Sequence, residues 1–93
     1  MAAIDLTTAE FGSHARFEMR RRGVAEEEVR GVLARPEKST PVRPGRIVVQ
    51  GPIHRAGGSG VYLLRVFIDI DRTPPVVVTA YLTSKLAKYR GQP

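Results

Sequence analysis

The sequence of 93 residues contains no cysteine and no tryptophan, and it has only two histidines. Without cysteine there is no disulfide framework, thiol nucleophile or zinc-finger site, and two histidines offer little to a metal ion. We therefore expect neither a cofactor nor a metal site. No apolar run approaches the roughly 18 residues of a membrane span, and the first residues lack the features of a signal peptide. These absences predict a cytoplasmic protein without a membrane partner.

Acidic residues are also scarce. Nine Asp and Glu stand against fifteen Lys and Arg, which leaves a formal net charge of +6. Only three of the basic residues are lysine, and the planar guanidinium fork of arginine suits phosphate better than an ammonium group does. The charge therefore favours an anionic partner.

The chain changes character near Pro36, from helix-forming to β-branched residues. Ser13 is a candidate N-cap for a helix running to about Arg22, and Gly23 follows where helices commonly end. A second helix is expected to begin near Ala25, because three glutamates then follow at the positive end of the helix dipole. Proline disfavours helical geometry in the residue before it, so this helix ends before Pro36.

Beyond Pro36 the apolar period becomes two, which is typical of strands. Strands are expected over Arg46–Gln50, Val61–Ile70 and Val76–Leu82. Pairing Ile70 with Val76 across the last hairpin places Arg65 opposite Tyr81 and Phe67 opposite Thr79. In the last strand this phase turns four residues toward the core, namely Val76, Val78, Ala80 and Leu82.

Together these elements predict one α+β domain over residues 1–93, with a core from about 13 to 90 and an N-terminal extension over 1–12. Two N-terminal helices are expected to pack on one face of a three- or four-stranded antiparallel sheet.

The open sheet face carries the first candidate site. There a guanidinium, Arg65, lies beside the hydroxyls of Thr79 and Tyr81 and the ring of Phe67. Such a group can hold and polarise a phosphodiester while the ring stacks on a base. The alternative is an ordinary sheet face on which Arg65 only increases solubility.

A line of polar residues on the first helix is the second candidate. His14, Glu18 and Arg22 follow one another at a spacing of four, so each side chain can contact the next. The helix dipole disfavours charge on a histidine in the first turn, which keeps the imidazole available as a proton acceptor. The alternative is a capping or packing histidine, and from the helix face His14 reaches Arg65 only around a sheet edge.

Basic residues around Phe17 and in the C-terminal tail form the third group. An exposed aromatic ring among arginines suits nucleic acid or an acidic protein. Equally, the first twelve residues can fold over Phe17 and bury it. The candidate nucleic-acid-binding residues are Arg16, Arg20, Arg21, Lys85, Lys88 and Arg90.

Both halves of the sequence resemble a domain family of unknown function with the pattern His-Ala-x-x-Arg-Met-x-x-Arg-Gly, which is grouped with the RelE and ParE toxins and with barnase-like ribonucleases. The matching residues in the first half are Ser13-His14-Ala15, Met19, Arg22-Gly23-Val24, Glu28-Val29, Val32-Leu33 and Pro36-Glu37. In the second half they are Leu64-Arg65-Val66, Val77-Val78-Thr79-Ala80-Tyr81, Thr83-Ser84-Lys85 and Lys88-Tyr89.

The resemblance implies an endoribonuclease of a toxin–antitoxin module, acting on free or ribosome-bound RNA without a metal. Its partner is expected to be a small cognate antitoxin. The RNA 2′-hydroxyl attacks the adjacent phosphate while side chains move protons and stabilise the phosphorane charge. By this resemblance His14 transfers a proton, Arg65 clamps the phosphate, Arg22 supports it, and Thr79 and Tyr81 orient it or act as the acid.

Glu18 departs from the family pattern, which has arginine at this position. The inverted charge means either that Glu18 orients His14 or that this helix has lost its role. The alternative function is therefore a non-catalytic module of the same fold that binds nucleic acid or protein, including a protein target such as gyrase.

Overall fold

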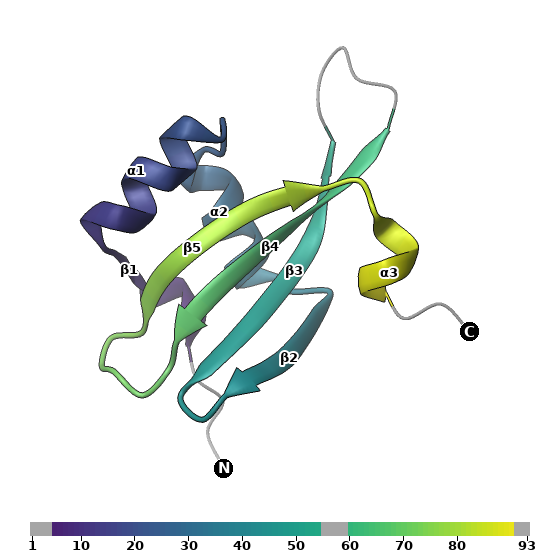
Figure 1. The fold of residues 1–93 in the computed structure, drawn as a ribbon. Coiled ribbons are helices and arrows are strands. Elements are labelled where there is room, and N and C mark those ends of the chain that lie inside the picture. Colours follow the sequence, from purple (N-terminus) through teal and green to yellow (C-terminus); the bar gives the residue numbers. More distant parts are fainter. Residues whose placement is uncertain (1–4, 55–59, 91–93) are drawn as a thin grey trace.

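Five strands form one mixed sheet in the order β1-β5-β4-β3-β2 (Figure 1). The structure is a computed structural model that describes residues 5–54 and 60–90. Its elements in chain order are the 3-10 helix η1 (Leu6–Thr8), β1 (Glu10–Phe11), α1 (Ser13–Arg21), α2 (Glu26–Ala34), β2 (Lys38–Arg43), β3 (Arg46–His54), β4 (Val61–Asp69), β5 (Val76–Thr83) and α3 (Leu86–Arg90).

This architecture corrects the expected one of two N-terminal helices on a three- or four-stranded antiparallel sheet. The sheet has five strands, β1 precedes both long helices and pairs in parallel with β5, and a third helix follows β5. The strand β1 has two residues, too few to show a period, yet Phe11 is buried in the core. Every residue of β2 is exposed, so that strand carries no apolar alternation either.

The helices begin and end for the reasons that their sequences suggest, with one shift. Gly12 rather than Ser13 is the N-cap of α1, and Gly23 adopts a left-handed φ of 71° just after that helix. The backbone N–H of Ala25 donates to the Glu28 carboxylate at the start of α2 (3.0 Å). That helix ends at Ala34, before Pro36.

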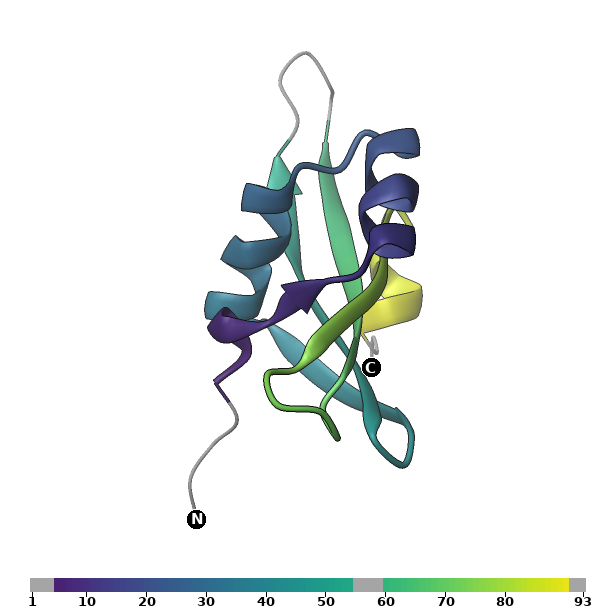
Figure 2. The ribbon, with the colours of Figure 1, turned by 90° about the vertical axis from the view of Figure 1, so that its left-hand side faces the viewer.

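The helices α1 and α2 lie on one side of the sheet and α3 lies beyond its other side (Figure 2). The core between α1, α2 and the sheet is built from apolar residues of the helices and of the central strands. From the helices these are Ala15, Met19, Val29, Val32 and Leu33, and from β4 they are Leu64, Val66 and Ile68. Burying this apolar surface is the main source of stability.

A register shift between β4 and β5 corrects part of the expected pairing. Arg65 pairs with Tyr81 and Phe67 with Thr79, which confirms those two pairs. Past Phe67 the register changes by one residue, so Asp69 rather than Ile70 lies opposite Val76. Because the bulge inserts a residue there, Val77 enters the core in place of Val76 and Val78. Ala80 and Leu82, beyond the bulge, keep the expected orientation.

Candidate active site

Three adjacent strands place polar side chains side by side on the sheet face away from α1 and α2. Gln50 of β3 pairs with Arg65 of β4, and Arg65 pairs with Tyr81 of β5. Because paired residues on neighbouring strands point to the same side, the three side chains form a row across the sheet. The Arg65 Nε donates to Gln50 Oε1 (3.3 Å) and its Nη1 donates to the Tyr81 hydroxyl (2.9 Å).

The short helix α3 carries a second tyrosine, Tyr89, which lies beside this row. The Tyr89 ring lies with its centroid 4.0 Å from Arg65 Cζ, and the rings of Phe67 and Tyr81 are each 5.9 Å away. Phe67 and Tyr81 stack at 6.2 Å, and Tyr81 meets Tyr89 edge to face at 6.5 Å. We call Arg65, Phe67, Tyr81 and Tyr89 the arginine–aromatic cluster.

Within the described residues, Arg65 has no carboxylate partner. Its hydrogen-bond acceptors are an amide and a phenol, both neutral. By contrast, Arg46 on the same sheet face forms a bidentate ion pair with Asp69 (2.6 and 3.2 Å). A half-buried guanidinium among neutral groups keeps its full charge for an anion, and its fork matches the geometry of a phosphate.

The two tyrosines of the cluster have different affinities for their protons. Burial is the main cause that raises the pKa of Tyr81, and its hydrogen bond with Tyr89 adds to the effect. The same hydrogen bond lowers the pKa of Tyr89, and the positive charges of Lys88 and Arg65 lower it further. Tyr89 therefore loses its proton more readily than Tyr81, and Tyr81 holds its proton more tightly.

Arg22 and Thr79, both expected at the site, meet at the free edge of β5. The Arg22 Nη1 donates to Thr79 Oγ1 (3.1 Å) and to the carbonyl oxygen of Ala80 (3.0 Å). Its Nη2 lies 3.1 Å from a carboxylate oxygen of Glu18. Because Thr79 pairs with Phe67, this contact lies beside the arginine–aromatic cluster.

The structure does not bring His14 to the cluster. His14 is exposed in the first turn of α1 and, within the described residues, makes no hydrogen bond to Arg65, Tyr81 or Thr79. The charge of Glu18 is directed to Arg21 (2.6 Å), whose hydrogen bond is the main cause that lowers the Glu18 pKa. Glu18 therefore holds arginines at the end of α1 and forms no hydrogen bond to His14.

Of the cations expected to bind nucleic acid, three already hold carboxylates. Arg16 pairs with Glu26 (2.6 Å), Arg21 with Glu18, and Arg90 with Glu37 through two hydrogen bonds (2.7 and 3.1 Å). Within residues 5–54 and 60–90, Arg20, Lys85 and Lys88 have no such partner.

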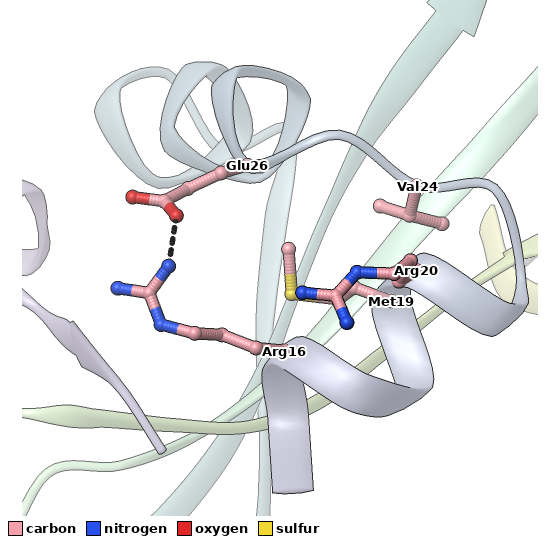
Figure 3. A pocket seen from close by; sticks show the side chains of 5 residues that line it. All are labelled: Arg16, Met19, Arg20, Val24 and Glu26. Atoms are coloured by element: carbon pink, nitrogen blue, oxygen red, sulfur yellow. Dashed lines mark hydrogen bonds and ion pairs between the residues drawn. The ribbon is translucent and has the colours of Figure 1, made fainter. Parts of the chain in front are cut away.

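Phe17 is exposed, with 57% of its surface accessible, so residues 5–12 do not bury it. Arg20 lines a hollow of about 220 Å³ between α1 and α2, which has Met19 and Val24 at its base (Figure 3). The Arg16–Glu26 ion pair closes one side of this hollow (Figure 3). The outer surface of α1 therefore presents the Phe17 ring and the guanidinium of Arg20, which has no carboxylate partner in the described part of the chain.

Sequence reasoning overlooked Tyr89 and Gln50. Tyr89 lies in a basic tail that we interpreted only as a source of phosphate contacts, although a tyrosine soon after the strand of Tyr81 was a usable signal. Gln50 is the last residue of the predicted strand Arg46–Gln50. Its burial could not be predicted from that strand alone, because it depends on the neighbouring strands on both sides.

In the part of the chain that the structure describes, no three His, Asp or Glu side chains are grouped to hold a metal ion. No helix there is both long enough and apolar enough to cross a membrane. Comparison of the chain with protein-family models, curated proteins and solved structures finds no match.

Proposed function

We propose that the chain is a toxin-like endoribonuclease that cleaves RNA with side chains of the arginine–aromatic cluster. The observation that supports this proposal is the guanidinium of Arg65, which carries an uncompensated charge among three aromatic rings. Its Nη2 has no hydrogen-bond partner in the described residues and is available to a phosphate oxygen. The rings offer surfaces on which RNA bases stack.

The two phenols supply the proton transfers. In its ionised form Tyr89 takes the proton of the RNA 2′-hydroxyl as that oxygen attacks the adjacent phosphorus, and Arg65 stabilises the phosphorane charge. Tyr81 gives its proton to the 5′-oxygen as the phosphorus–oxygen bond breaks. The products are a 2′,3′-cyclic phosphate and a 5′-hydroxyl. Because the pKa of Tyr81 is raised and that of Tyr89 is lowered, the proton then passes from Tyr89 to its neighbour Tyr81, which restores the starting state.

The remaining candidates take supporting roles in this proposal. Arg22 and Thr79, held together at the β5 edge, orient the RNA backbone that leaves the cluster. Arg20, Lys85 and Lys88 add phosphate contacts, because their charges are not matched by carboxylates within the described chain. His14 is not required for proton transfer.

Cleavage of RNA by the purified chain tests the proposal. We expect products with cyclic-phosphate ends, and we expect cleavage to persist when EDTA is present. Arg65→Lys keeps the charge but loses the fork, so we expect most of the activity to be lost. Arg43→Lys is the matched control, because Arg43 is exposed and its side chain, within the described residues, donates only to the carbonyl oxygen of Pro44. Equal cleavage by the two variants would contradict the proposed role of Arg65.

A second candidate function is a binding module without catalysis, and the exposed Phe17 beside Arg20 favours it. In that case the chain binds RNA or a protein, such as gyrase, and cuts no RNA under any of these conditions.

The resemblance to toxin families leads us to propose a cognate antitoxin as the protein partner. Expression of the chain alone is then expected to arrest growth, and co-expression of a small protein encoded beside it is expected to restore growth. Unchanged growth on expression of the chain alone would contradict the toxin assignment.

A further inference from the structure

Among the described residues, Gln50 is the only polar or charged residue that is buried, with 3% of its surface exposed. Its amide nitrogen donates to Glu37 Oε2 (3.2 Å) and to the backbone carbonyl of Tyr89 (3.1 Å). Its amide oxygen accepts from Arg65 Nε (3.3 Å). One amide therefore contacts the strand that carries Arg65 and the helix that carries Tyr89.

These three neighbours fix the orientation of the amide. A guanidinium N–H needs an acceptor, whereas a carboxylate and a carbonyl both need a donor. The opposite orientation would place the amide nitrogen against Arg65 and the amide oxygen against Glu37 and Tyr89. A residue that offers a donor and an acceptor without charge satisfies all three, and glutamate or methionine at this position does not.

Glu37 holds the other side of α3. Its carboxylate forms two hydrogen bonds to Arg90, the residue after Tyr89, and it also accepts from Gln50. The Lys38 ammonium adds a longer contact to the Tyr89 carbonyl (3.5 Å). The helix α3 has only five residues, so these tertiary contacts must supply the stability that its own backbone hydrogen bonds do not.

We infer that Gln50 and Glu37 are positioning residues, which seat Tyr89 on Arg65 by holding α3 against the sheet and so assemble the phenol pair. They contact no substrate and act through Arg65 and Tyr89. The inference deepens the proposed function and rests on it for its kinetic consequence, but the docking of α3 can be measured without RNA.

The titration of Tyr89 tests the docking. The groups that face its ring and hydroxyl are Arg65 of β4, Tyr81 of β5 and Lys88 of α3. When α3 leaves the sheet, Tyr89 loses the hydrogen bond from Tyr81 and the nearby charge of Arg65. We therefore expect its pKa to rise toward that of an ordinary phenol. NMR of tyrosine labelled with carbon-13 follows the transition, and Tyr89→Phe identifies its signal.

Three variants separate the contacts. Gln50→Glu keeps an acceptor for Arg65 but sets a negative charge against Glu37, and Gln50→Met removes every hydrogen bond at similar size. Glu37→Gln keeps Gln50 itself but removes the negative charge and one of the two acceptor oxygens that Arg90 and Gln50 share. Glu27→Gln is its matched control, because it makes the same change of charge at an exposed site on α2. We expect the first three to raise the pKa of Tyr89 and the control to leave it unchanged.

Thermal unfolding shows which variants are folded. If the substitutions of the buried Gln50 unfold the chain, the Tyr89 titration of Glu37→Gln still tests the inference. For folded variants we expect kcat to fall by up to about 10²-fold, the scale of a small misplacement of reacting groups, with a smaller change in KM. A Tyr89 titration that coincides with the parent in the folded variants overturns the inference. If the titration shifts while the parent cuts no RNA, the positioning holds and the proposed function fails.

Discussion

The two faces of β4 differ in what their side chains contact. Leu64, Val66 and Ile68 point toward α1 and α2 and are fully buried among other apolar groups. Arg65 and Phe67, which alternate with them, point toward α3 and remain half-buried among rings and hydrogen bonds. Burial stabilises the first face, whereas on the second an uncompensated charge is kept accessible at some cost in stability. Adjacent residues of one strand therefore allow stability and chemistry to be tested separately.

The largest effect is expected on the helix side. Leu64→Ala removes buried atoms and leaves a cavity, so it should lower the free energy of unfolding by roughly 2–5 kcal/mol. Denaturant unfolding measures this loss. Cleavage per folded molecule should stay near the parent value, because the arginine–aromatic cluster does not include this residue. A loss below 1 kcal/mol would contradict the assignment of faces.

The second effect is expected one residue along. Arg65→Ala should reduce RNA cleavage by roughly 10²-fold or more, about 2.7 kcal/mol in transition-state stabilisation. Its free energy of unfolding should change by no more than about 1 kcal/mol, because no core atoms are removed. Cleavage assays and denaturant unfolding on the same sample compare the two quantities. A loss of stability equal to that of Leu64→Ala would mean that both faces of β4 contribute equally to the free energy of unfolding.

A smaller effect concerns the Glu37–Arg90 ion pair that holds α3. The ion pair lowers the pKa of Glu37 below its unfolded value, so it stabilises the fold at pH values above the unfolded pKa. This stabilisation is lost as the pH falls through the folded pKa. Glu37→Gln should therefore lower the melting temperature at neutral pH. The corresponding loss in the free energy of unfolding is at most about 1 kcal/mol. The melting temperatures of variant and parent should converge in acid, and a constant difference would exclude the linkage.

The smallest effect is expected at His14, which the resemblance made a catalytic residue. Because His14 lies outside the cluster, His14→Ala should lose far less than the roughly 10²–10⁴-fold typical of a general acid or base. The pH profile of cleavage should also keep its shape. A loss within that range, with one limb of the profile flattened, would restore His14 as a proton-transfer group and remove that role from the tyrosines.

The sequence predicted those elements whose apolar residues repeat with a clear period. The helices α1 and α2, the central strands and the pairing of Arg65 with Tyr81 follow from such repeats and from capping residues such as Gly23. It did not predict β1 or β2, since one is two residues long and the other is exposed throughout. The bulge near Val77 was also missed, because an inserted residue becomes visible only against a partner strand.

The candidate site was predicted in the same uneven way. Arg65, Phe67, Thr79 and Tyr81 share a strand face and were grouped by alternation alone. Tyr89 joins them through tertiary contacts of a five-residue helix, which no local pattern reports. The buried state of Gln50 likewise depends on two neighbouring strands and on α3.

Arg22 has a consequence for the association of copies of this chain. Within residues 5–54 and 60–90, β1 pairs with only the first two residues of β5, and no strand covers the rest of that edge. Such an edge offers free backbone groups on which another chain can align and begin to aggregate. The guanidinium of Arg22 donates a hydrogen bond to the carbonyl oxygen of Ala80, in the middle of this edge. It thereby places a charged group across the edge. The same arginine that lies beside the cluster thus also protects the sheet from growing by addition of further strands.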